Sequence, residues 1–408
     1  MPTAARTILS VFATFAVGGQ QVRFAALANR YGPRYRHLIV AMDGNDACRE
    51  RLSPSLDVSF PSVPIRKGAT LANLRAFRRF LGEHRPDLLV THSWGSIEWA
   101  MANLTLLIRR TVVQPAPVRP TPGLPAVVRH VHVEDGFGPE ERDRQIRRRV
   151  LTRRVVLRWS SLALPSRTLV RIATGTWRLD PRHVHYIPNG IDLGRFSGAH
   201  DPARAAAWPG EGPVVATVAA LRAEKNLGRL LRAFAAATLG RDPGLVPGRS
   251  LAGRSRAGRS LPGRLVIIGD GPERAGLEAL AAALGIATRV KFLGHVADPA
   301  PLYAGFDLFA LSSDTEQMPI AVIEAMAAGL PVAATEVGDV RGMLAAENAP
   351  WIGPRDDAAL AASLAALLGD AALRARVGAA NRVRALATFD QERMFADYAA
   401  LFDGDTPP

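Results

Sequence analysis

The sequence predicts an α/β fold made of two doubly wound, Rossmann-like domains, and three observations support this prediction. Strand-like and helix-like segments alternate along the chain, which is typical of parallel sheets with helices on both faces. The alternation occurs twice, before and after a stretch rich in Ala, Pro and Gly that ends near Gly212. The chain has 408 residues, which is too long for one ordinary hydrophobic core.

The first half contains short apolar runs that predict strands, most of them followed by a segment with helical periodicity. The predicted strands are residues 8–14, 37–41, 88–91 and 126–133. The predicted helices are residues 22–31, 71–83, 97–108 and 140–159. This order indicates a parallel sheet covered by helices, and we expect the first domain to span residues 1–193.

The second half repeats the pattern, and we expect it to form a domain over residues 194–388. The predicted strands are residues 214–218, 265–268, 290–293, 308–311 and 331–334. The predicted helices are residues 227–236, 273–284, 358–368, 371–386 and 391–402, the last within a separate terminal segment, 389–408. Residues 240–263 lack apolar periodicity and have low complexity, which predicts a disordered insert.

The charge of the chain favours anionic partners. Its formal net charge is +14, from 51 Lys and Arg against 37 Asp and Glu, which suits nucleic acid, phosphorylated substrates or an acidic membrane surface. Residues 140–159 hold many of the arginines, with an apolar stripe at Ile146, Val150 and Leu157. Two interpretations stay open: a solvated helix with i,i+4 ion pairs, or a basic amphipathic face on anionic lipid or a lipid-phosphate acceptor.

The cysteine content indicates a reducing compartment, and the hydropathy does not indicate a membrane-spanning helix. The single cysteine, Cys48, excludes a disulfide framework and a cysteine-built metal site. No apolar run reaches the roughly 18 residues of a membrane-spanning helix. The apolar run at residues 7–17 leads into Gly18 and Gly19, so we interpret it as a first strand rather than a signal peptide. We therefore expect a cytoplasmic protein, with peripheral contact to the inner membrane face left open by the basic segment.

Two glutamates follow the predicted strand at residues 308–311. Glu316 falls in the loop at the carboxyl end of this strand, and Glu324 falls inside the next helix. In open α/β sheets, ligands gather at this edge, where the N-termini of helices offer free N–H groups to anions. Two carboxylates beside such a helix start suit a ligand that carries both hydroxyls and phosphates. A sugar nucleotide is a ligand of this kind.

Other polar groups and glycines also follow predicted strands. They are Gly18 and Gly19, His92, the His132–Glu134–Asp135 segment, and Lys225. Glycine at such a position lets the backbone approach a ligand closely. His130 and His132 point to the same side of their strand, but no third ligand stands at a suitable spacing, so a metal site is not expected.

The segment TEQMPIAVIEAMAAGLPVAAT resembles the E-x7-E signature of retaining glycosyltransferases of family 4. These enzymes have the GT-B fold, in which two Rossmann-like domains face each other across a cleft. The resemblance runs from about residue 8 to residue 402, interrupted by the insert at 240–263. The strings THSWGS, VEDGFGPEE and SDTEQMP are similar to enzymes of exopolysaccharide or cell-envelope glycan assembly.

The resemblance implies an activity and a mechanism. It implies transfer of a hexose from a nucleoside diphosphate sugar to a hydroxyl of a lipid-linked or polysaccharide acceptor, with retention of configuration by front-face attack. It also implies that the last helix crosses back to the first domain. Cationic side chains would neutralise the leaving diphosphate, so no metal or other cofactor is required.

The resemblance also implies residue roles. The catalytic residues would be His132, Glu316 and Lys225. The donor-binding residues would be Gly18, Gly19, Arg222, Lys225, Phe292, Leu293, Met318, Pro319, Ile320, Ala321 and Glu324. The acceptor-binding residues would be His92, Glu134 and Asp135.

The chain departs from the family pattern at two places. Val133 replaces the usual glycine after His132, and Ala220 stands where the pattern has an arginine, so Arg222 is offset by two residues. The D-x-D string at residues 403–405 falls in what we expect to be an exposed tail, and we assign it no role.

Two alternative functions stay open. A nucleotide-sugar epimerase could share the fold, whereas a phosphorylase would need a pyridoxal phosphate lysine motif that is not apparent. A basic nucleic-acid-binding protein would need aromatic side chains within its basic stretches. Aromatic residues make up only 6% of the chain, so we expect no nucleic-acid partner.

Overall fold

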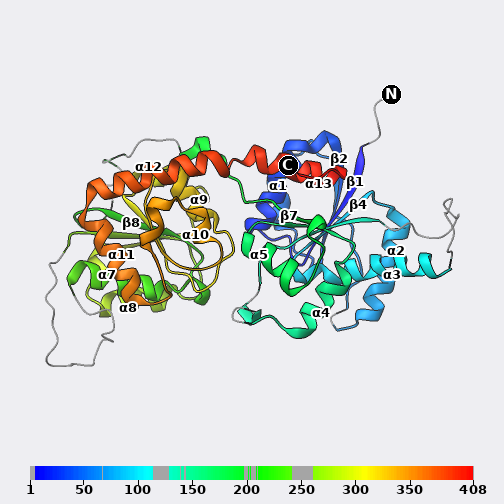
Figure 1. Ribbon diagram of the computed structural model, residues 1–408, viewed down its shortest axis with the longest axis horizontal. Helices are drawn as coiled ribbons and strands as arrows, with labels where there is room; N and C mark the ends of the chain where they lie inside the picture. Colours follow the sequence, from blue (N-terminus) through cyan, green and yellow to red (C-terminus); the bar gives the residue numbers. More distant parts are fainter. Residues whose placement is uncertain are drawn as a thin grey trace. The chain divides into compact units, whose positions relative to one another are not determined.

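The computed structural model describes residues 5–66, 68–113, 128–137, 139–141, 144–196, 210–240 and 261–407, together with residues 201, 203 and 208. The chain divides into two compact units (Figure 1). The first comprises Met1–Ile187 and Phe395–Pro408, and the second comprises Pro188–Met394. The predicted boundaries, after residues 193 and 388, lie near these divisions. Of the insert predicted at 240–263, residues 241–260 lie outside the described residues.

The first unit contains a seven-stranded sheet with the order β3-β2-β1-β4-β5-β6-β7. All neighbouring strands pair in parallel. The strands are β1 (Arg6–Phe12), β2 (Tyr35–Ala41), β3 (Val58–Ser59), β4 (Leu88–His92), β5 (Arg129–Val133), β6 (Ser161–Leu164) and β7 (Val184–Tyr186). The predicted α/β class is therefore confirmed for this unit. The sequence did not predict β3 and β6.

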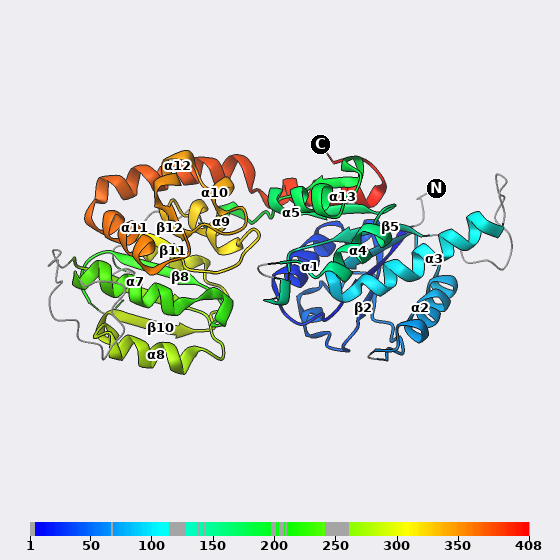
Figure 2. The same cartoon turned by 60° about the horizontal axis from the view of Figure 1, so that its bottom comes forward.

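Helices cover both faces of this sheet because successive strand residues point to opposite sides. Leu9 and Val11 of β1 pack on the side of α2 (Thr70–His84) and α3 (Ile97–Val113), whereas Phe12 packs with Phe24 of α1 (Gly19–Tyr31). Figure 2 shows α2 and α3 side by side. The helices of this unit are α1 (Gly19–Tyr31), α2 (Thr70–His84), α3 (Ile97–Val113), α4 (Arg147–Val156), α5 (Arg167–Arg171) and most of α13 (Gln391–Asp403).

The helix predicted over residues 140–159 is shorter than expected, and its apolar stripe faces the interior of the protein. Only Arg147–Val156 forms α4, after a 3-10 turn at Pro139–Glu141. Leu157 is buried, and Val150 packs against the same core cluster, so the predicted apolar stripe faces the protein interior. The exposed apolar side chains are instead Leu151, Val155 and Trp159.

The second unit contains a six-stranded parallel sheet with the order β10-β9-β8-β11-β12-β13. The strands are β8 (Val214–Val218), β9 (Arg264–Ile268), β10 (Val290–Gly294), β11 (Leu308–Leu311), β12 (Val332–Thr335) and β13 (Ile352–Gly353). The helices are α7 (Leu227–Leu239), α8 (Arg274–Ala283), α9 (Ile320–Ala327), α10 (Val340–Met343), α11 (Asp357–Gly369), α12 (Ala371–Thr388) and the start of α13.

The second sheet separates two hydrophobic cores. On one side, α7 packs beside α11 over Val215 and Leu265, and on the other, α9 packs beside α12 over Val214 and Val266 (Figure 1). Val214 and Val215 alternate between the cores, as expected for a strand buried on both faces. Within the described residues, no single helix has the length and hydropathy to cross a membrane. Only α11 and α12 together pass such a test, and they are bent by 106°.

Candidate functional site

The loops after β8 and β11 lie side by side, since these two strands are neighbours in the second sheet. Lys225 ends a 3-10 turn in the first loop, and Glu316 lies in the second. The Nζ atom of Lys225 donates a hydrogen bond to Oε1 of Glu316 at 2.6 Å. Both side chains are part-buried. The structure thus brings together two of the three predicted catalytic residues at the carboxyl edge of the sheet.

A residue of the same loop donates a hydrogen bond to the Glu316 carboxylate. The hydroxyl of Ser313 donates to Oε1 of Glu316 at 2.7 Å. The hydroxyl of Thr335, at the end of β12, donates to the carbonyl of Ser313 at 2.7 Å. The orientation of Glu316 therefore depends on two neighbouring strands.

Glu324 lies on α9 and accepts a hydrogen bond from the hydroxyl of Tyr303 at 2.7 Å. Burial raises the pKa of Glu324 above its ordinary value, although this hydrogen bond acts in the opposite direction. Tyr303 is fully buried. Glu324, which accepts this hydrogen bond, was a predicted site residue, but no motif in the sequence indicated Tyr303.

The predicted phosphate-facing segment forms the start of α9. Pro319 is the N-cap, no side chain caps this end, and Ile320 and Ala321 occupy the first turn. Met318 is buried, and Asn189 anchors it by donating its side-chain N–H to the Met318 carbonyl at 3.0 Å. The first turn of a helix carries free N–H groups and a partial positive charge, so it suits an anion.

The remaining donor-side candidates of the second unit lie on other strands. Arg222 is exposed in the loop after β8, three residues before Lys225. Phe292 and Leu293 are half-buried on β10, the edge strand of the sheet. All three lie at or near the carboxyl edge, as predicted, and their roles stay predictions.

In the first unit, the loops after β1 and β5 meet through Asp135. Gly18 is the N-cap of α1 and Gly19 its first residue. From the first turns of this helix, Arg23 donates to Asp135 at 2.6 Å and Gln20 donates to the same carboxylate. The carboxylate of Asp135 remains partly exposed, whereas the other two predicted acceptor-binding residues, His92 and Glu134, are buried.

His92 is buried rather than open to an acceptor. Its ring stacks on Phe12, with the centroids 3.9 Å apart and the planes 13° apart. Both ring nitrogens are buried, and neither has a hydrogen-bond partner among the described residues. Burial and the nearby Arg23 lower the pKa of His92 well below 6.5. The ring therefore packs as a neutral aromatic group, and its predicted role in binding the acceptor stays a prediction.

His132 and Glu134 are also fully buried. The Oγ1 atom of Thr91 lies 2.8 Å from Nδ1 of His132 and 2.8 Å from Nε2 of His130, and Nδ1 of His130 lies 2.6 Å from the Ser160 hydroxyl. Nε2 of His132 lies 3.7 Å from the Glu134 carboxylate. These side chains form a buried polar cluster, and the catalytic role of His132 and the acceptor-binding role of Glu134 stay predictions.

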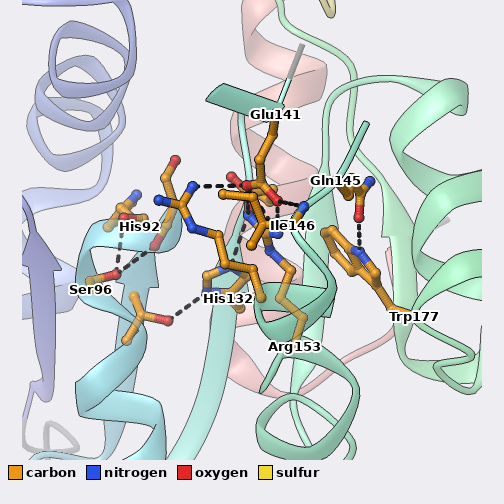
Figure 3. Close-up of polar contacts among 12 residues, drawn as sticks. His92, Ser96, His132, Glu141, Gln145, Ile146, Arg153 and Trp177 are labelled. Carbon is orange, nitrogen blue, oxygen red and sulfur yellow. Dashed lines mark hydrogen bonds and ion pairs between the residues drawn. The ribbon is translucent and has the colours of Figure 1, made fainter. Parts of the chain in front are cut away.

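Arg153 of α4 closes this cluster. Its guanidinium lies 3.4 Å from the Glu134 carboxylate. It lies 3.2 Å from the Glu141 carboxylate, and Figure 3 labels both Arg153 and Glu141. It also lies over the rings of Trp94 and Trp177, at 4.9 and 5.0 Å from their centroids. The cation is thus both paired and stacked, which offsets the cost of burying it. Arg153 explains why Glu134 turns inward, and no sequence motif indicated it.

Two further expectations concern metals and the C-terminus. Among the described residues, no three or more His, Cys, Asp or Glu side chains are grouped to hold a metal ion, and the predicted lack of a metal requirement stays a prediction. Asp403 does not lie in an exposed tail. It ends α13, is largely buried, and accepts hydrogen bonds from Arg6 at 3.1 Å and from Tyr35 at 3.3 Å.

Two family models match the chain. The model of Glycosyltransferase Family 4 matches residues 17–195, and that of Glycosyl transferases group 1 matches residues 203–384. Together with the two parallel sheets, these matches show that the chain belongs to the group 1 glycosyl transferases of family 4, with the GT-B type of α/β fold.

Similar sequences and structures agree with this family. A D-inositol 3-phosphate glycosyltransferase of Salinispora tropica is 32% identical over 337 residues, which cover 78% of this chain and 63% of that protein. The match thus spans less than two thirds of this curated relative. The structure of Anabaena HepE in complex with UDP has a TM-score of 0.72 at 17% identity, covering 98% of this chain and 100% of HepE. A Rickettsia africae glycosyltransferase has a TM-score of 0.72 at 15% identity, covering 98% and 99%.

Proposed function

We propose that this protein is a retaining glycosyltransferase that moves a hexose from a nucleoside diphosphate sugar to an acceptor hydroxyl. The observation that carries the proposal is the pairing of Lys225 with Glu316 beside the start of α9. A cation, free helix N–H groups and carboxylates within one loop cluster match a diphosphate and a sugar joined by one bond.

Each group of the cluster has a chemical task in this proposal. Lys225 and the first turn of α9 bind the diphosphate, on which negative charge grows as its bond to the sugar breaks. Glu316 binds hydroxyls of the transferred hexose. Glu324, held by Tyr303, binds the ribose hydroxyls. Phe292 and Leu293 supply backbone groups for the nucleobase, and Arg222 supplies a second cation.

The transfer step balances without an additional reagent. The bond between the anomeric carbon and the phosphate oxygen breaks, and the acceptor oxygen forms a new bond to that carbon on the same face. The acceptor proton passes to the departing phosphate. The protein then contributes mainly positioning and electrostatic stabilisation, and no metal ion is needed.

The names of similar proteins support this class of donor and acceptor. Two further structures of HepE hold UDP with glucose and UDP-glucose, which supports a nucleotide sugar as donor. A lipopolysaccharide core glycosyltransferase of Rhizobium meliloti, LpsE, is 31% identical over 138 residues, 34% of this chain and 41% of that protein. This relative favours a glycan of the cell envelope or an exopolysaccharide as acceptor. The D-inositol 3-phosphate glycosyltransferases instead favour a small phosphorylated polyol, so both kinds of acceptor should be tested.

Exposed apolar side chains on α4 and in the turn after it support an acceptor held at a membrane. Leu151 and Val155 of α4 are 61% and 50% exposed, and Trp159, three residues after the helix ends, is 58% exposed. Arg147, Arg148 and Arg154 of α4 are exposed as well, and so is Arg158, two residues after the helix ends. We therefore include peripheral contact with an anionic membrane surface, on its cytoplasmic side, in the proposal.

Incubating the protein with UDP-, GDP- and ADP-hexoses and a panel of acceptors tests the function. The panel should hold inositol 3-phosphate, oligosaccharides and polyprenyl-linked sugars. We expect one donor class to give a glycosylated product with the anomeric configuration of the donor, read by proton NMR. An inverted anomer would overturn the retaining mechanism. Conversion of the donor to its epimer without transfer would favour an epimerase instead.

A further inference from the structure

A buried ion pair joins the loops that carry Lys225 and Glu316. Arg229, in the first turn of α7, donates from Nη1 to the Asp314 carboxylate at 2.7 Å and to the Ser312 carbonyl at 2.8 Å. The side chains of Arg229 and Asp314 are each 9% exposed. Neither residue carries a role in the donor site as described above.

Asn226 connects this ion pair to the lysine. It follows Lys225 directly and has a left-handed backbone conformation with φ of 44°. Its side-chain oxygen accepts from the backbone N–H of Arg229 at 3.2 Å, and its side-chain nitrogen donates to Asp314 at 3.2 Å. One side chain thus caps α7 and contacts the carboxylate that lies two residues before Glu316.

Two more hydrogen bonds link the loops through their backbones. The N–H of Asp314 donates to the carbonyl of Glu224 at 2.8 Å. The hydroxyl of Ser312 donates to the carbonyl of Lys225 at 3.0 Å. Residues 224–226 and 312–314 are therefore cross-linked on the interior side of the Lys225–Glu316 pair, so a shift of one loop would move the other.

Stability alone does not explain a buried ion pair here. Apolar side chains of similar volume are often as stable, because both charges lose their hydration when they are buried. Fixed geometry is the better explanation, since binding groups must be held within about 0.5 Å of the productive arrangement. We propose that Arg229 and Asp314 are positioning residues that set the separation between Lys225 and Glu316. This inference rests on the donor site proposed above.

A neighbouring pair on the same helix provides a matched control. Arg232 donates to Asp357, the first residue of α11, at 2.5 Å. Among the described residues, Arg232 makes no hydrogen bond to the loops of Lys225 and Glu316, but it shares Asp357 with Arg229, whose Nε lies 3.7 Å from the same carboxylate. Arg232→Lys keeps the positive charge beside this shared carboxylate, so it should leave the separation of Lys225 and Glu316 unchanged and is the control for Arg229→Lys.

The first arm of the experiment needs no ligand. The sequence contains three lysines, Lys67, Lys225 and Lys291. Reductive ¹³C-dimethylation keeps their charge and gives resonances that Lys→Arg variants assign. We expect Glu316→Gln to shift the Lys225 resonance, and we expect Asp314→Asn to shift it in the same direction. The resonances of Lys67 and Lys291 should stay at their positions, which would show that the fold is intact. An unmoved Lys225 resonance in Asp314→Asn would overturn the inference.

The second arm measures binding of UDP and GDP by calorimetry. Asp314→Asn should weaken binding about 10-fold in the wild-type background but at most about 2-fold when Lys225 is already alanine, because residues that act through one another are not additive. Equal losses in both backgrounds would contradict a positioning role. If the wild type binds neither nucleotide nor any sugar nucleotide, the proposed function fails, whereas the resonance of Lys225 still decides whether Asp314 positions it. Should Asp314→Asn fail to fold, Arg229→Lys is the substitute, with the same expected outcomes.

Discussion

Lys225 and Glu316 are 91 residues apart in the sequence, and the ammonium of one donates a 2.6 Å hydrogen bond to the carboxylate of the other. Each of them balances the charge of the other. A bound diphosphate would share Lys225 with Glu316, since an ammonium group has three donors. The two residues therefore have separable effects on binding and on transfer.

Replacing Lys225 by alanine should weaken nucleoside diphosphate binding about 10- to 100-fold, because a hydrogen bond to a charged group contributes about 1.5–3 kcal/mol. Glu316→Gln keeps the size of the side chain but removes its charge. It should change nucleotide affinity less than Lys225→Ala does and lower kcat/KM for transfer by about 100-fold. Calorimetry and initial rates on both variants measure this. A Lys225→Ala protein with unchanged affinity would remove the lysine from the site.

Glu324 should make nucleotide binding depend on pH. Burial raises the pKa of its carboxyl, so the side chain takes up a proton at a higher pH than an ordinary glutamate. Because the ionised carboxylate is the stronger acceptor for ribose hydroxyls, affinity should fall as the pH is lowered through this raised pKa. Glu324→Gln corrects for protonation of the nucleotide itself, so the ratio of the two affinities isolates the carboxyl. A ratio that does not change between pH 8 and pH 5 would count against the ribose contact.

The buried histidines should make the first unit unstable in mild acid. Burial lowers the pKa of His130 to about 3 and that of His37 to about 4. The folded pKa values lie below the unfolded value of about 6.5, so the stabilisation is fully present above pH 6.5 and is lost as the pH falls toward 3. The loss for each residue is at most about 1.4 kcal/mol per pH unit.

Urea unfolding between pH 8 and pH 4 measures this slope. His130→Gln keeps a polar group near Thr91 but cannot titrate, so it should be less stable at pH 8 and less sensitive to acid. His295, which is exposed in the second unit, supplies the control variant His295→Gln. Equal slopes in all three proteins would show that burial of His130 does not govern the acid response.

The exposed surface of α4 and the turn after it should bind anionic lipid. Replacing Leu151, Val155 and Trp159 by serine should abolish sedimentation with vesicles of phosphatidylglycerol and phosphatidylcholine, because the apolar contact would be lost. Binding of the wild type should also weaken with added salt. Val383 and Leu386, exposed on α12, supply a matched pair of apolar replacements with no expected effect. Wild-type protein that stays in solution with anionic vesicles would contradict the membrane contact.

Much of the fold could be predicted because parallel strands buried on both faces appear as apolar runs. The predicted bounds of β8 and β11 are those of the structure, and the helices around them differ by a few residues. The placement of Glu316 and Glu324 followed from the same strand, since the loop and helix after it are fixed by chain direction. β6 was not predicted, because its sequence SLAL contains no β-branched or aromatic residue and therefore has little preference for a strand.

The sequence alone could not predict that the side chains of His132 and Glu134 point into the protein interior. It depends on Arg153, Trp94 and Trp177, which come from three separate segments and meet only after packing. The Arg229–Asp314 pair is hidden for the same reason, because its members are 85 residues apart. Asn226 did carry a local signal, since asparagine before an apolar helical run is a common N-cap.

Calorimetric titration of the protein with UDP-, GDP- and ADP-hexoses, repeated on Glu324→Ala, tests the central claim most directly. The account predicts that one nucleotide class binds the wild type and that the variant binds it at least about 10-fold more weakly. Absence of binding by every sugar nucleotide, or equal binding by the variant and the wild type, would contradict it.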